Sequence, residues 1–198
     1  MNMVPDDVRL EMDGGRVTLA ALRPTHVAAL FETARDPDTW AYMPVTIRTP
    51  DDVEQLVERA LAAKQCGNEF PFVVIDRNSG SIVGSTRLLD QSHQNRSAEI
   101  GFTWISAPAR RTRINTECKY LLLKYAFEAL NLIRVQIKTD SRNLRSQTAI
   151  ERIGFVKEGV LRSHRILPDG YVRDSVYYSM IAQEWRHASQ RLRRMLDA

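Results

Sequence analysis

The feature that most constrains the fold is a strand–helix–strand–helix unit in the middle of the chain. A β-rich run at 98–105 leads through a proline- and arginine-containing turn into the longest amphipathic helix, expected over 115–130. An alternating strand at 134–139 and a helix over 143–153 follow. Such a unit favours a mixed α/β fold in which helices cover a sheet.

Strands and hairpins flank this unit. A strand at 17–22 precedes a helix over 25–34 and a second helix that begins with a Thr49 cap. The further expected elements are a hairpin of 70–76 with 82–88, a polar loop over 90–96, a hairpin of 155–161 with 172–180, and a basic helix over 182–196. We find no linker rich in Gly, Ser or Pro. The prediction is therefore one domain over 1–198, of the α/β (α+β mixed) class, with a mostly antiparallel seven-stranded sheet.

Composition narrows the function classes. With 43% hydrophobic residues, a net charge of +4 and 198 residues, the chain can bury a core and is not expected to be disordered. No apolar run approaches the roughly 20 residues of a membrane helix, and residues 1–13 lack the pattern of a signal peptide. Two cysteines suit free thiols in a reducing compartment, so we expect a cytoplasmic protein. The small positive charge suits an anionic small molecule or a nucleic acid.

The basic turn at 109–117 (ARRTRINTE) lies between a strand and the longest helix. A helix N-terminus exposes unbonded N–H groups and a partial positive charge, and three arginines within four positions add bidentate donors. Pyrophosphate binding is the functional interpretation. A solvated basic loop is the structural one, because charge clusters usually lie on the surface.

Two further positions carry possible chemistry. Glu99 places a carboxylate in a β-rich run, where it either faces solvent by alternation or faces a cleft and acts as a base. Asn143 and Ser146 stand three apart in the first turn of a helix, so their side chains can share a face. Helix capping by Asn143 is the alternative explanation for that pair.

The order of these motifs resembles the GNAT superfamily of N-acetyltransferases. The resemblance covers about residues 16–186. Within the superfamily, the sequence is similar to the branch of ribosomal-protein N-terminal acetyltransferases. It is carried by the segments 22–24 (LRP), 98–102 (AEIGF), 143–146 (NLRS), 151–155 (ERIGF), 158–159 (EG), 173–179 (RDSVYYS) and 184–185 (EW), together with the arginine-rich turn. Each segment is short, and the specificity comes from their order and spacing.

This resemblance implies a fold and a set of cofactor contacts. The strands at 98–105 and 134–139 would splay into a V-shaped cleft for acetyl-CoA, with helices on both faces of the sheet. The family's pyrophosphate loop falls on Arg110, Arg111, Thr112, Arg113, Ile114, Asn115 and Thr116. Backbone amides of Trp104 and Ile105 would bind the thioester at a strand bulge, and Asn143 would contact the CoA arm. One departure is plain: the family's two small loop positions hold Arg113 and Asn115, where glycine usually lets backbone approach phosphate.

By the same resemblance the chain is an acyl-CoA-dependent N-acyltransferase. It would move acetyl from acetyl-CoA to a primary amine, either a protein N-terminus or a small molecule, without a metal. We expect Glu99 to be the base and Ser146 to protonate the leaving thiolate. Trp40, Tyr42, Met43 and His164 are the candidate walls of the acceptor site, although the loop aromatics can equally cap the first helices.

Two other function classes stay open at this point. Arg113 and Asn115 motivate a non-catalytic acyl-CoA-binding or regulatory module of the same fold. Nucleic-acid binding is less favoured, because aromatic residues do not interleave with the basic C-terminal run. That run is expected to be a solvated helix face or part of a homodimer contact.

Overall fold

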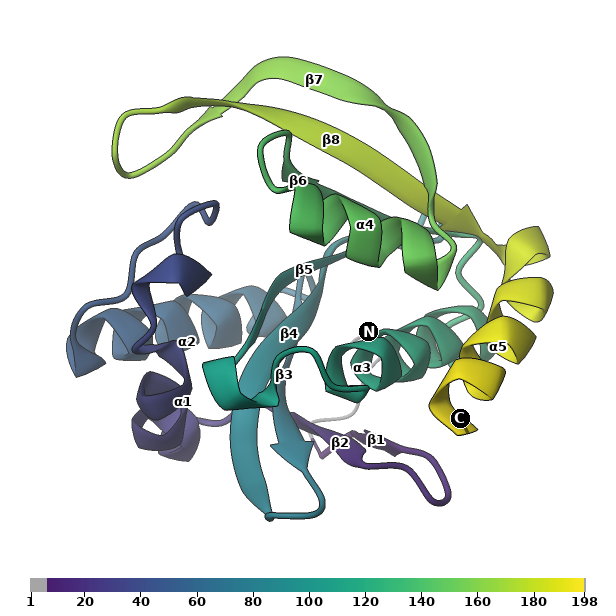
Figure 1. Ribbon diagram of the computed structural model, residues 1–198, viewed down its shortest axis with the longest axis horizontal. Helices are drawn as coiled ribbons and strands as arrows, with labels where there is room; N and C mark the ends of the chain where they lie inside the picture. The colour runs from purple at the N-terminus through teal and green to yellow at the C-terminus, as the bar shows by residue number, and fades with distance from the viewer. Residues whose placement is uncertain (1–6, 198) are drawn as a thin grey trace.

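The computed structural model describes residues 7–197 (Figure 1). Its strands are β1 (Arg9–Glu11), β2 (Val17–Ala21), β3 (Phe70–Asp76), β4 (Ser81–Ser92), β5 (Ser97–Ile105), β6 (Arg134–Asp140), β7 (Val156–Ile166) and β8 (Val172–Ile181). Its helices are α1 (Val27–Ala34), α2 (Pro50–Gln65), α3 (Ile114–Lys124), α4 (Leu144–Ile153) and α5 (Ala182–Asp197). The predicted Thr49 cap is confirmed, because Thr49 Oγ1 accepts a hydrogen bond from Asp52 N.

All eight strands join one sheet in the order β1-β2-β3-β4-β5-β6-β8-β7. Every neighbouring pair is antiparallel except β5 and β6, which are joined through α3 and run parallel. Alternation along β3 sends Phe72 into a core cluster with α3 and α5, and Val73 into a second cluster with α1 and α2. Helices therefore cover both faces of the sheet, as predicted.

The parallel pair β5 and β6 separates after a short contact. Only Ser97 to Glu99 of β5 pair with β6, opposite Arg134 to Gln136. In the rest of β5, backbone groups that point toward β6 have no ladder partner on that strand. The predicted V-shaped cleft between these two strands is present, and an unpaired strand edge forms part of its wall.

A β-bulge interrupts β5 beside this edge. Arg87 of β4 pairs with Gly101 and Ser85 pairs with Trp104, so Phe102 and Thr103 together oppose Thr86. Phe102 adopts a left-handed φ of 45°, as the first residue of such a bulge can. The expected position at Trp104 and Ile105 is therefore wrong by two residues, because the extra residue enters the strand at Phe102.

Several element boundaries also differ from the prediction. The sheet has eight strands instead of seven, because the three-residue β1 pairs with β2. The predicted polar loop over 90–96 is shorter than expected, because β4 continues to Ser92. Strand β7 is longer than the expected 155–161, because it continues to Ile166. The long helix ends in a π-helical turn over Tyr125–Ala129, closed by the hydrogen bond from Leu130 N to Tyr125 O. Within 7–197, no helix combines the length and apolarity that crossing a membrane requires.

Candidate functional site

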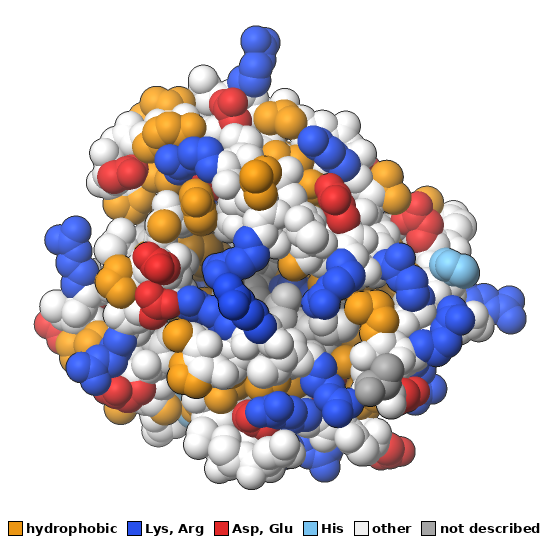
Figure 2. Space-filling model, in the orientation of Figure 1, with side chains coloured by type: hydrophobic (Ala, Val, Ile, Leu, Met, Phe, Trp, Pro, Cys, Tyr) orange, Lys and Arg blue, Asp and Glu red, His pale blue; other side chains and the backbone are white. Residues whose placement is uncertain are grey.

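A cavity of about 730 Å³ occupies the opening between β5 and β6. Its walls come from β5, β6, β8, the start of α3, and α4, together with Tyr42 and Met43 of the segment between α1 and α2. Lys and Arg side chains gather around a hollow on this face of the molecule (Figure 2). The cleft therefore combines apolar and polar wall residues with Lys and Arg side chains around its opening.

The structure brings most of the predicted site residues to this cavity. Those that line it are Tyr42, Met43, Trp104, Ile105, Arg110, Arg111, Thr112, Arg113, Asn115, Thr116, Asn143 and Ser146. Four predicted residues do not line it, namely Trp40, Glu99, Ile114 and His164. Ile114 points the other way, into the core cluster.

The N-terminus of α3 presents unused backbone donors to the cavity. Thr112 Oγ1 accepts from Ile114 N at 3.2 Å, so the Thr112 hydroxyl satisfies the first backbone N–H of α3. The N–H groups of Asn115 and Thr116 have no hydrogen-bond acceptor within the described part of the chain. Two free amides at a helix N-terminus form an anion-binding site.

The presence of Arg113 and Asn115 where the family usually has small residues does not strain the backbone of this loop. Arg113 has φ −71° and ψ −9°, which any L-residue adopts, and Asn115 lies within α3. The left-handed residue of the loop is Arg111, with φ 59°. The Arg113 guanidinium donates to the carbonyl of Leu196 and so contacts the end of α5. Of the loop arginines, the exposed Arg111 makes no side-chain hydrogen bond to another described residue.

Arg110 has a structural role in the same loop. Its Nη1 lies 2.5 Å from Asp36 Oδ2, and its Nη2 donates to Thr39 Oγ1. Its Nε donates to Ile105 O at 2.9 Å. Arg110 therefore joins the end of β5 and the loop before α3 to the segment that follows α1.

We expect Arg110→Ala to lower the melting temperature and to weaken acetyl-CoA binding several-fold, because it removes three contacts that fix the loop. Thermal unfolding and calorimetric titration measure the two effects. Arg48→Ala is the control, since Arg48 is exposed and lies in the segment between α1 and α2 that Arg110 contacts. Equal behaviour of the two variants would contradict the assigned role of Arg110.

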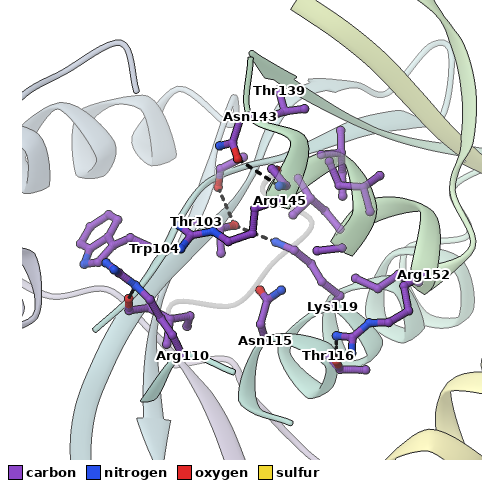
Figure 3. Close-up of a pocket in the computed structure, with 18 of the residues that line it drawn as sticks. Thr103, Trp104, Arg110, Asn115, Thr116, Lys119, Thr139, Asn143, Arg145 and Arg152 are labelled. Carbon is purple, nitrogen blue, oxygen red and sulfur yellow. Dashed lines mark hydrogen bonds between the residues drawn. The ribbon is translucent and has the colours of Figure 1, made fainter. Parts of the chain in front are cut away.

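The predicted pair Asn143 and Ser146 lies at the start of α4. Asn143 Oδ1 accepts from Ser146 N at 3.0 Å, so Asn143 is the N-cap of α4. Both side chains also line the cavity. In Figure 3, Asn143 and Arg145 approach from α4 while Asn115 and Lys119 approach from α3.

Trp40 and Trp104 pack against each other at the edge of the second core cluster. Their ring centroids are 5.3 Å apart, and Trp104 Nε1 donates to Thr33 Oγ1. Trp40 is buried, and its Nε1 donates to Ala34 O at 2.7 Å. Trp40 thus caps the first helix, which is the structural alternative, and the expectation that it forms an acceptor wall is wrong.

Glu99 is buried beside the cavity, at the last paired position of β5 and β6. Its Oε2 accepts from Lys138 Nζ at 2.8 Å and from Gln136 Nε2 at 3.1 Å. Burial raises the pKa of Glu99, and the hydrogen bond from Lys138 opposes that rise. Lys138 lines the cavity, so one hydrogen bond connects Glu99 to the cavity wall.

Lys119 is a site residue that the sequence analysis missed. It projects from α3 into the cavity, is 6% exposed, and its Nζ lies 2.7 Å from Thr103 Oγ1 at the bulge (Figure 3). Burial lowers the pKa of this lysine to about 8. No local sequence pattern marked Lys119, because the burial of 116–123 is a property of the folded structure.

The β7–β8 hairpin contacts the segment between α1 and α2 through Arg173, which lines the cavity. Arg142 lies over the rings of Tyr171 and Tyr42, at 3.4 and 5.4 Å from their centroids. Arg173 of β8 donates to Tyr42 O at 3.2 Å. The predicted acceptor residue His164 lies outside, half-buried against Ser175 and Tyr177, because β7 continues past it as an edge strand.

The comparison with known proteins agrees with this geometry. The family model described as "Acetyltransferase (GNAT) domain" matches residues 16–156. This chain belongs to the GNAT acetyltransferase family. Its relatives include the Bacillus subtilis (strain 168) protein named "Putative ribosomal N-acetyltransferase YdaF", 40% identical over 106 residues. That alignment covers 54% of this chain and 57% of the relative's length, so the chain spans less than two thirds of it.

Two further proteins are similar to this GNAT member over a larger share of the chain. "Uncharacterized N-acetyltransferase YnaD" of Bacillus subtilis (strain 168) is 24% identical, over 79% of this chain and 88% of the relative. The structure of a GCN5-related N-acetyltransferase from Brucella melitensis is 26% identical with a TM-score of 0.88, over 97% of this chain and 86% of that one. The predicted family and its ribosomal-protein branch resemblance are thereby confirmed.

Proposed function

We propose that this protein transfers the acetyl group of acetyl-CoA to a primary amine, either a protein N-terminus or a small molecule, by direct attack in a ternary complex. One observation carries the proposal. The unpaired edge of β5 and the free amides of Asn115 and Thr116 face a single cavity of about 730 Å³. One wall suits an amide-containing arm and the other suits a diphosphate.

The residues present fit such a co-substrate. The diphosphate would lie on the N–H groups of Asn115 and Thr116, with the exposed Arg111 and Arg145 as counter-charges. The amide groups of the pantetheine arm would hydrogen-bond to the backbone of β5 beyond Glu99, where β6 no longer pairs with that strand. The thioester would then lie near Asn143 and Ser146 at the start of α4.

The chemical step begins with a neutral amine. Free α-amino groups have a pKa of about 8 and lysines about 10.4, so a base increases the reactive fraction near pH 7. The amine nitrogen attacks the thioester carbon and loses a proton, which passes to Glu99 through water, or through Lys138 when its Nζ gives a proton to Glu99 and takes one from the nitrogen. The carbon–sulfur bond then breaks, and Ser146 supplies a proton to the CoA thiolate. Glu99 and Ser146 regain their starting states by proton exchange with water.

The geometry of the loop before α3 removes the reason for considering a non-catalytic acyl-CoA-binding module. It rested on Arg113 and Asn115 at the small positions of the loop. Arg113 has ordinary helical dihedral angles and contacts Leu196 of α5, and the Asn115 amide faces the cavity free of other partners among the described residues. Neither residue blocks the amides that would hold the diphosphate.

Calorimetric titration with acetyl-CoA, followed by thiol release on a panel of amines, tests this proposal. We expect micromolar binding and CoA release that depends on both acetyl-CoA and the amine. Absence of binding would contradict the assignment of the cavity. Binding without turnover on any amine would contradict the assigned reaction and return the chain to the non-catalytic class.

A further inference from the structure

We propose that the acceptor carries a carboxylate close to its reacting amine, and that Arg173 binds this carboxylate. This inference rests on the proposed function and deepens it, because it assigns a chemical class to the acceptor. The two sources of that chemistry are a free amino acid and a peptide N-terminus with an acidic residue next to it. One arm of the experiment below addresses each source.

Arg173 is a buried cation that the fold does not neutralise directly. Its residue is 6% exposed and lines the cavity. Its Nη1 donates to the Tyr42 carbonyl, while its buried Nε has no hydrogen-bond partner among residues 7–197. No carboxylate in that part of the chain lies within ion-pair distance of it. Buried guanidinium groups are costly unless they are paired, so an anionic partner is the missing component.

The neighbouring carboxylates are already engaged by other cations. Asp140 is fully buried and accepts both Nε and Nη2 of Arg142, at 3.0 and 2.8 Å. Glu99 accepts Lys138 at 2.8 Å. The exposed Asp90 also lies 3.8 Å from Lys138, so each of these carboxylates has another cation as its partner and none pairs with Arg173. An acceptor with one carboxylate would supply the missing partner at this end of the cavity.

The position of Arg173 places it with the acceptor and away from the diphosphate. It comes from β8 and bonds to Tyr42, whereas the anion-binding amides come from α3, and Figure 1 shows α4 between these two elements. The planar guanidinium can bind a carboxylate with two parallel hydrogen bonds, which fixes orientation as well as charge. Arg173 is thus suited to hold an acceptor so that its amine meets the thioester.

The experiment uses matched acceptors that differ only in a carboxylate. One arm compares alanine with alaninamide, and the other compares peptides that begin Ala-Asp with peptides that begin Ala-Asn. We expect kcat/KM to be at least tenfold higher for the acidic member in one of the two arms. In Arg173→Gln that ratio should fall to near one, mainly through a higher KM for the acidic member.

Arg165→Gln is the matched control, because Arg165 is exposed on β7 opposite Arg173 and does not line the cavity. It should keep the wild-type ratio. Arg173→Lys retains charge without the planar fork and should give an intermediate ratio, which also covers a failure of the glutamine variant to fold.

The outcomes separate this inference from the proposed function. Turnover of amines with no acidic preference in wild type, or a preference that survives in Arg173→Gln, overturns the role of Arg173 alone. Binding of acetyl-CoA without turnover on any amine overturns the proposed function and this inference with it. A preference in the first arm identifies a free amino acid, and one in the second arm identifies a peptide.

Discussion

Lys119→Met should stabilise the folded protein by about 3 kcal/mol at pH 7. Burial lowers the pKa of Lys119 from 10.5 to about 8, so the folded state holds a charged lysine at a cost. Each pKa unit corresponds to about 1.36 kcal/mol, which sets the size of the effect. Methionine has a similar shape and no charge to desolvate. Urea unfolding of the two proteins at pH 7 measures the difference.

Lys119→Met should also change how the stability of the folded protein depends on pH. The folded pKa lies below the unfolded one, so the unfolded chain binds more protons between about pH 8 and pH 10.5. The Lys119 contribution to wild-type stability should therefore rise with pH across that window, whereas Lys119→Met should lack this rise. Lys124→Met is the control on the same helix, because Lys124 is half exposed and its pair with Glu128 is worth little. A methionine variant less stable than wild type at pH 7 would contradict the argument.

The same substitution should weaken acetyl-CoA binding at least fivefold. Lys119 is a cation in a cavity suited to a diphosphate-bearing molecule, and its only described hydrogen-bond partner is the neutral Thr103 hydroxyl. A stabilising change that costs ligand affinity is the expected pattern where a site stores an unfavourable charge. Calorimetric titration of the Lys119 and Lys124 variants with acetyl-CoA tests it, and equal affinities would remove Lys119 from the binding site.

Local signals in the sequence were sufficient to predict that the turn before α3 forms part of the candidate site. The turn before α3 combines a strand end, Pro108, three arginines and a helix start within a few residues, so no long-range contact is needed to interpret it. The Thr49 cap and the Asn143 cap are local in the same way. The resemblance added the splay of β5 and β6, which pattern alone does not specify.

The bulge explains why the faces of β5 could not be predicted. Simple alternation would place Ile100, Phe102 and Trp104 on one face. The structure places Ile100 in the cluster with α3 and Trp104 in the cluster with α1, because the extra residue at Phe102 reverses the phase. A bulge in a strand without glycine at that position leaves no clear mark in the sequence.

The acceptor end depends on contacts between distant segments. Tyr42, Arg142 and Arg173 meet only when the β7–β8 hairpin folds over the segment between α1 and α2. Each is an ordinary surface residue type by sequence, so neither periodicity nor spacing signals their meeting. The burial of Arg173 and the pairing of Asp140 are tertiary properties, and the proposed acceptor class rests on them.

Glu99→Gln should lower kcat at least 100-fold near pH 7 while leaving acetyl-CoA affinity close to that of wild type. General base catalysis contributes about 10²- to 10⁴-fold, and Glu99 does not line the cavity that would hold acetyl-CoA. Glutamine keeps the size of the side chain and an oxygen acceptor for Lys138 and Gln136. Steady-state kinetics with calorimetric titration measures both quantities, and Glu54→Gln on the exposed face of α2 serves as the control.

The pH profile decides whether Glu99 acts as the base. Burial raises its pKa, so wild-type kcat/KM should rise with pH as this carboxyl loses its proton, and Glu99→Gln should lose that limb. Acceptors with a lower amine pKa need the base less, so the loss should shrink as the amine pKa of the acceptor falls. An equal loss for all amines at every pH would make Glu99 a positioning residue for Lys138, because a structural defect does not depend on how readily the acceptor gives up its proton.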